Sequence, residues 1–96
     1  MPDVLQPMDP ATAHRLIRAI LEGGTVVWTQ HSVDEMAKDD MTTVDAENVL
    51  RAGVVEPPEW ENREWRYRVR TARMYVVVAF ESKVELTVIT AWRVRR

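Results

Sequence analysis

The stretch REWRYRVRT, residues 63–71, alternates large apolar side chains with arginines. Because successive side chains of a β-strand point to opposite faces, this period of two predicts a strand with one buried face and one basic face. The apolar series is Trp65, Tyr67 and Val69, and the basic series is Arg66, Arg68 and Arg70. Such a strand needs neighbours in a sheet and a second layer over its apolar face.

The segments after this strand predict its neighbours. ARMYVVVAFE, residues 72–81, is almost uniformly apolar, and VELTVITAWRV, residues 84–94, alternates again. Short turns around Ala72 and between residues 82 and 83 would join the three segments into an antiparallel meander of hairpins. In the last segment the alternation assigns Trp92 to the core and Arg93 to the opposite face.

The segments before this strand predict helices. Asp9 and Pro10 are typical of a helix start, and apolar residues then recur at helical spacing as far as Gly23 and Gly24. TVVWTQ, residues 25–30, is short and β-branched, which is typical of a strand or an extended link.

Two capping-box patterns predict two shorter helices. Ser32 is followed three residues later by Glu35, and Thr42 by Asp45, which predicts helices over residues 33–38 and 44–52. Gly53 fits the position just after the second helix, and VVEPPEWEN, residues 54–62, is expected to be a loop.

Together these elements predict a single α+β domain over residues 1–96, with N-terminal helices packed on one face of a small antiparallel sheet. Residues 1–8, with prolines at positions 2 and 7, are expected to be a loosely ordered lead-in.

The composition argues against several classes of protein. The chain has no cysteine, which excludes disulfides and thiolate metal sites. No apolar run approaches the roughly 20 residues of a membrane helix, and the first residues lack a secretion signal, so we expect a cytoplasmic protein without membrane contact. The two histidines lack metal-site spacing, and neither a metal nor another cofactor is expected.

The formal net charge of −2 conceals an uneven distribution. Residues 1–62 carry four basic and twelve acidic side chains, whereas residues 63–96 carry nine basic and three acidic ones. Such a separation fits halves that neutralise each other, a basic face for nucleic acid, or a basic face for an acidic protein. The sequence leaves all three open.

The basic face of the predicted sheet holds most of the candidate functional residues. Arginine binds phosphate and carboxylate groups through the several N–H donors of its planar guanidinium group. The candidate phosphate-binding residues are Arg66, Arg68, Arg70 and Arg73. The other side chains expected on this face are Tyr75, Glu85, Thr87 and Arg93.

Cleavage of RNA without a metal needs a base for the 2′-hydroxyl, cations for the developing charge and an acid for the leaving oxygen. The candidate catalytic residues are His31, Glu85, Tyr75, Arg68 and Arg93. His31 or Glu85 would be the base, and Tyr75 would stack on a nucleobase or donate a proton. The alternative is a solvated strand face whose arginines pair with Glu64, Glu81 and Glu85.

A family resemblance covers roughly residues 26–92. The chain resembles small toxin domains of the RelE/ParE superfamily, and more closely a family of small uncharacterised domains encoded beside MqsA-type helix-turn-helix antitoxins. The matching residues are His31, Met36, Thr42, Leu50, Gly53 and the segment LTVITAW. Where that family has arginine before the methionine and an Arg-Gly pair after it, this chain has Glu35, Asp39 and Asp40.

The resemblance implies a RelE/ParE-like toxin fold. It also implies a type II toxin, a metal-independent endoribonuclease that acts on mRNA and is held inactive by an antitoxin. The candidate antitoxin is an MqsA-like helix-turn-helix protein. A second hypothesis uses the same arginines differently. In it, the chain is a non-catalytic binding module that docks an acidic antitoxin or regulatory protein on the basic face.

Overall fold

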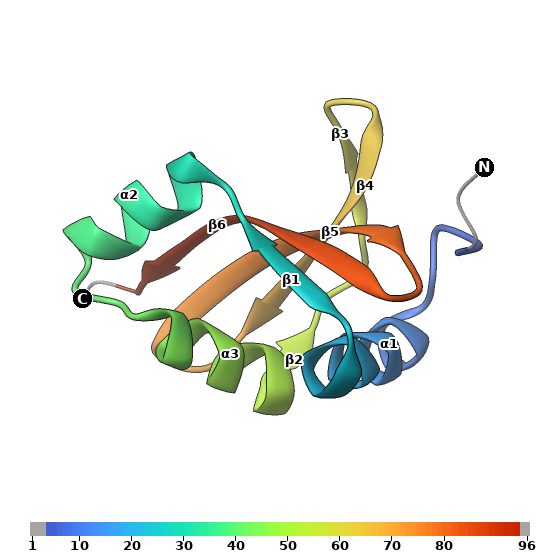
Figure 1. Ribbon diagram of the computed structural model, residues 1–96, viewed down its shortest axis with the longest axis horizontal. Helices are drawn as coiled ribbons and strands as arrows, with labels where there is room; N and C mark the ends of the chain where they lie inside the picture. The colour runs from blue at the N-terminus through green and yellow to red at the C-terminus, as the bar shows by residue number, and fades with distance from the viewer. Residues whose placement is uncertain (1–3, 95–96) are drawn as a thin grey trace.

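The computed structural model describes residues 4–94 and has the predicted α+β fold (Figure 1). The helices are α1 (Pro10–Gly23), α2 (Gln30–Lys38) and α3 (Thr43–Ala52). The strands are β1 (Thr25–Trp28), β2 (Val54–Val55), β3 (Glu59–Glu61), β4 (Glu64–Arg70), β5 (Met74–Ser82) and β6 (Glu85–Arg93). Strands β4, β5 and β6 form the expected antiparallel meander.

The sheet is larger than the meander. Its strand order is β1-β6-β5-β4-β2, with β1 parallel to β6, and β3 pairs separately with β4. The loop predicted over residues 54–62 is therefore wrong, because this segment folds back along β4 as β2 and β3. Asn62 and Arg63 both have positive φ, 51° and 64°, which is the conformation of a tight two-residue hairpin turn.

The helices cover one face of the sheet and one end of it. Figure 1 shows α1 and α3 below the sheet, and the two helices pack against each other. Helix α2 follows β1 and packs against β6. The side chains completely buried between these layers include Ile17, Ile20, Leu50, Tyr67, Val76 and Leu86.

Helix α2 begins three residues earlier than predicted. Its cap is Thr29, whose hydroxyl accepts from the backbone N–H of Ser32 at 3.0 Å. The Ser32 hydroxyl is buried and donates to the Thr29 carbonyl at 2.7 Å. The predicted box of Ser32 with Glu35 is wrong, because Thr29 lies one turn closer to the end of β1 and already caps the first free N–H groups.

The other capping box is confirmed. Asp45 accepts from the backbone N–H of Thr42 at 2.9 Å, and the Thr42 hydroxyl accepts from the backbone N–H of Asp45 at 3.1 Å. Gly53 ends α3 where the helix runs against β4. A Cβ there would lie 2.6 Å from the Val49 carbonyl oxygen and 2.8 Å from that of Arg70, so only glycine permits this approach.

The lead-in is anchored where the structure describes it. Met8 is buried, its N–H donates to the Tyr67 hydroxyl at 3.0 Å, and that hydroxyl donates to the Gln6 side-chain oxygen at 3.2 Å. Burial raises the pKa of Tyr67, so its hydroxyl stays protonated as a donor. Residues 4–8 have no regular secondary structure, but residues 6–8 are not loosely ordered; positions 1–3 lie outside the described residues.

Candidate functional site

The three arginines of β4 lie on one face, as predicted. Tyr67 and Val69, which alternate with them, are fully buried on the helix side. The exposed fractions of the arginine side chains are 16% for Arg66 and 43% for both Arg68 and Arg70. We call the surface that they share, on the side of the sheet away from α1 and α3, the open face.

Four glutamates between residues 56 and 64 neutralise the charge of this row. The partners within 4 Å of the three guanidinium groups are Glu56, Glu59, Glu61 and Glu64. Of the pairings considered from the sequence, the one with Glu64 forms, whereas Glu81 accepts instead from the Thr87 hydroxyl at 3.2 Å. Three positive charges therefore face four negative ones, two of which lie on β3, and the open face is not a basic surface.

Arg68 differs from its two neighbours in how its donors are used. The Nε of Arg66 donates to Glu64 at 3.0 Å, and the Nε of Arg70 donates to Glu56 at 2.9 Å. The nearest carboxylate oxygens to Arg68, on Glu56 and Glu59, are both 3.9 Å from its terminal nitrogens, beyond hydrogen-bond length. Its Nε is buried and has no acceptor.

Two stacked aromatic rings lie beneath Arg68. Tyr75 and Trp92 have ring centroids 5.0 Å apart and planes 7° from parallel. The guanidinium carbon of Arg68 is 5.8 Å from the Tyr75 centroid and 6.0 Å from that of Trp92, within range of cation–π attraction. This arrangement gives Arg68 an apolar and electron-rich support on one side.

Trp92 reaches the open face because of an irregularity in β6. Val77 pairs with Thr90, but the next residue of β5, Val78, pairs with Val88, so Ile89 has no partner. This bulge shifts the alternation of every later residue of β6 by one position. The sequence assignment of Trp92 to the core is therefore wrong, and so is that of Arg93 to the open face.

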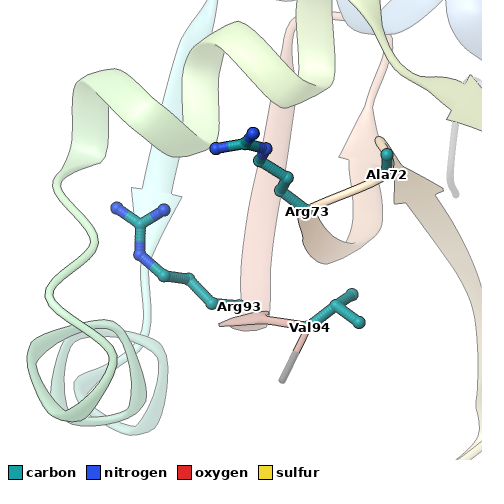
Figure 2. Close-up of a pocket in the computed structure, with 4 residues that line it drawn as sticks. All are labelled: Ala72, Arg73, Arg93 and Val94. Carbon is teal, nitrogen blue, oxygen red and sulfur yellow. The ribbon is translucent and has the colours of Figure 1, made fainter. Parts of the chain in front are cut away.

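Arg93 lies on the helix side of the sheet (Figure 2). Its Nε donates to the Asp39 carbonyl at 2.8 Å, one terminal nitrogen donates to the Asp40 carbonyl at 3.1 Å, and Asp45 lies 3.6 Å away. The Asp39 carboxylate also accepts from the Arg93 backbone N–H at 2.9 Å. Arg93 thus ties the end of β6 to the link between α2 and α3.

Arg73 does not join the arginines of β4 either. It is exposed in the turn between β4 and β5, and together with Ala72, Arg93 and Val94 it lines a hollow of about 600 Å³ (Figure 2). Within residues 4–94, no acidic side chain pairs with its guanidinium group. The hollow contains two arginines, but it lies apart from the open face.

The candidate bases are distant from Arg68. His31 is exposed on α2, which packs against β6, so β5 and β6 separate it from β4. Glu85 begins β6, whereas the residue of β6 level with Arg68 is Thr90. At about 3.3 Å per residue these positions are roughly 17 Å apart. The five candidate catalytic residues do not converge on one point.

The structure instead defines a small hollow around Arg68. It has a volume of about 180 Å³ and is lined by Glu59, Glu61, Arg66, Arg68, Val77, Ile89, Thr90 and Trp92. Sequence reasoning missed its two glutamates and Trp92. The mirror pattern WENREW, where Trp60-Glu61 and Glu64-Trp65 flank Asn62 and Arg63, is the signal that could have revealed the β3–β4 hairpin.

Two other features bear on function. Within residues 4–94, no three His, Asp or Glu side chains are grouped so that they could hold a metal ion. In the same part of the chain, none of the helices is long and apolar enough to cross a membrane.

Comparison of the chain with protein-family models, with curated proteins and with solved structures finds no match. The resemblance to RelE/ParE-type toxins therefore stays a prediction that rests on short motifs.

Proposed function

We propose that the chain is a binding module whose open face docks a segment of a partner protein, with a carboxylate of that segment on Arg68. The observation that carries the proposal is the unused fork of Arg68, since the corresponding donors of Arg66 and Arg70 are filled by Glu64 and Glu56. The Nε itself is buried, so a partner carboxylate would bind the terminal nitrogens of Arg68, whose side chain is 43% exposed and whose nearest carboxylate oxygens are 3.9 Å away.

The aromatic support adds contact area for such a segment. Arginine, tryptophan and tyrosine are the residues that most often dominate the binding energy of protein interfaces. Here Arg68, Tyr75 and Trp92 already contact one another, and Val77 and Ile89 extend the apolar floor of the hollow. A partner segment with an apolar side chain next to its carboxylate would contact both the apolar floor of the hollow and the guanidinium group of Arg68.

The glutamates define the rest of the partner. The side chains of Glu59 and Glu61 are 70% and 62% exposed, and their distances to arginine nitrogens are 3.8–3.9 Å, so they can rotate away at little cost. Rotation of Glu59 would open the Arg68 fork and leave a carboxylate free for a basic residue of the partner. The expected segment therefore carries both charges, with an acidic residue for Arg68 and a basic one for Glu59.

The binding module is better supported than the ribonuclease. Acid–base catalysis needs its groups within hydrogen-bond reach of the reacting atoms, and neither His31 nor Glu85 lies near Arg68. RNA affinity also depends mainly on positive charge, which the glutamates of the open face cancel. The resemblance suggests an antitoxin as the partner, and the proposal applies to such a regulator.

The test is a titration of labelled protein with two synthetic peptides, followed by NMR. One peptide carries Glu between a leucine and a lysine, and the other carries Gln in place of Glu. We expect the first to shift the indole signal of Trp92 and to bind at least about tenfold more tightly than the second. Arg68→Met should abolish the difference, whereas Arg15→Ala, which removes an exposed arginine of α1, should keep it.

A second measurement separates the two functions. Wild-type protein and His31→Ala are incubated with single-stranded RNA in the presence of a chelator, and each is also induced in growing cells. Metal-independent cleavage that is lost in His31→Ala, together with equal affinity for both peptides, would replace the binding module with the ribonuclease.

A further inference from the structure

The sheet has one open edge at β1. This strand is the last in the strand order and pairs on one side only, with β6, within the part of the chain that the structure describes. Thr25 and Thr29 donate to the Val84 and Val88 carbonyls, which fixes the orientation of the strand. Since alternate residues of a parallel ladder face the neighbour, the N–H and C=O groups of Val26 and Trp28 point away from the sheet.

The opposite edge is protected in the usual ways. It is formed by residues 54–61, which include Pro57 and Pro58 and three glutamates. Proline removes backbone donors, and charged side chains oppose pairing with another strand. The sequence of β1, TVVW, has no charge and no proline, and its Val27 side chain is 38% exposed. The two edges are therefore very different targets for a further strand.

We propose that β1 pairs with β1 of a second copy of this chain, antiparallel and centred on Val27. In this register the N–H and C=O groups of Val26 bond to those of Trp28 in the second copy, and those of Trp28 bond to those of Val26 there. The two pairs together give about four backbone hydrogen bonds. The two Val27 residues are then directly opposite each other as a pair without hydrogen bonds. The Cα atoms of such a pair are about 4.5 Å apart, so the two side chains touch on the open face. The sheets of both copies then join into one.

The sequence around β1 leaves room for this pairing. In the same register Gln30, the first residue of α2, lies opposite Gly24 of the second copy, and His31 lies opposite Gly23. Gly23 has open space around its Cα, so no side chain obstructs the approaching helix. A bulky residue at Gly23 would meet the first turn of α2 in the other copy, whereas Gly24 is required by the fold itself, because a Cβ there would clash with the Val84 carbonyl.

A second copy fits this edge because the two flanks of β1 match each other: the glycines before the strand lie opposite the first residues of α2 in the second copy. The strand also lacks any charge that would repel its own copy. With only four residues in β1, the strand pair alone falls short of the roughly 1,000 Å² expected of a stable interface, so the dimer should form and dissociate with concentration.

The test combines sedimentation with amide exchange measured by NMR. We expect the average mass to rise with concentration, and the amides of Val26 and Trp28 to exchange fast in dilute protein and slowly in concentrated protein. The amide of Val27, which faces β6, should be protected throughout.

Matched variants locate the interface. Val27→Lys would place two positive charges opposite each other and should raise the dissociation constant about tenfold or more. Val54→Lys, which alters an exposed valine on the other edge, should leave it unchanged. Both variants keep the core residues, and their unfolding curves show whether each is folded.

Three results would overturn the proposal. One is protein that stays monomeric at millimolar concentration with fast exchange at Val26 and Trp28. The second is association that Val27→Lys leaves intact. The third is protection of these two amides only when an unrelated extended peptide is added, which would assign the edge to a different partner.

Discussion

Arg68 and Arg93 belong to one basic face in the sequence and to two different environments in the structure. Arg93 lies among the carbonyls of Asp39 and Asp40 and the carboxylate of Asp45, and it connects three elements. Arg68 lies over two aromatic rings, with 3.9 Å to its nearest carboxylates and one donor unused. An arginine whose donors are satisfied within the chain stabilises the fold, whereas one whose donors are unused is available to a partner.

The largest expected effect tests the role of Arg93. Arg93→Ala removes the hydrogen bonds to the Asp39 and Asp40 carbonyls, and hydrogen bonds that involve a charged group are worth about 1.5–3 kcal/mol. We expect the free energy of unfolding, measured in urea, to fall by about 2 kcal/mol. Arg73→Ala, the control in the same hollow, should change it by less than about 0.5 kcal/mol. If Arg93→Ala and Arg73→Ala are equally stable, Arg93 does not stabilise the fold, and the contrast drawn between Arg93 and Arg68 fails.

A smaller effect is expected at the aromatic support. Trp92→Leu keeps an apolar side chain but removes the stacked pair with Tyr75, which is worth about 0.5–1.5 kcal/mol beyond its buried area. The urea midpoint should fall accordingly, and the affinity for the Glu-containing peptide should fall as well. A loss of several kcal/mol would mean that Trp92 is a core residue, as its place in the alternation suggested.

Arg68 itself should contribute little to stability. Arg68→Met retains the contact with Tyr75 and Trp92 while removing a buried donor that has no acceptor, a change that is often neutral or stabilising. We expect the free energy of unfolding to stay within about 0.5 kcal/mol of the wild type. If instead this variant is as unstable as Arg93→Ala, Arg68 serves the fold and the proposed docking site fails.

The smallest effect concerns acid stability near Arg93. The backbone N–H of Thr42, then its hydroxyl, then the charge of Arg93 hold the pKa of Asp45 below its usual value of 3.8. The contribution of Asp45 is therefore complete above about pH 4 and is lost as the pH falls through the lower, folded-state pKa. Asp45→Asn should flatten the fall of Tm between about pH 5 and 2. If Tm falls equally with pH in the wild type and in Asp45→Asn, the Asp45 carboxylate does not contribute to acid stability.

Local patterns predicted the elements more reliably than the contacts between them. The alternation of Tyr67, Arg68 and Val69 gave the correct faces of β4, and the pairing of Thr42 with Asp45 gave the start of α3. The start of α2 was placed three residues late, because Thr29 and Ser32 are both acceptable caps and the backbone path out of β1 selects the first. The candidate site was predicted only as far as its row of arginines.

The sequence by itself determined the two faces of β4, and those of β6 up to the bulge at Ile89, because side-chain alternation is a property of a single strand. Only the tertiary structure decided where that alternation shifts, since a bulge exists only in relation to the partner strand β5. It also decided that β3 would bring Glu59 and Glu61 beside the arginines, and that β1 would occupy an unprotected edge. These are relations between segments far apart in the chain, and no local pattern of residues records them.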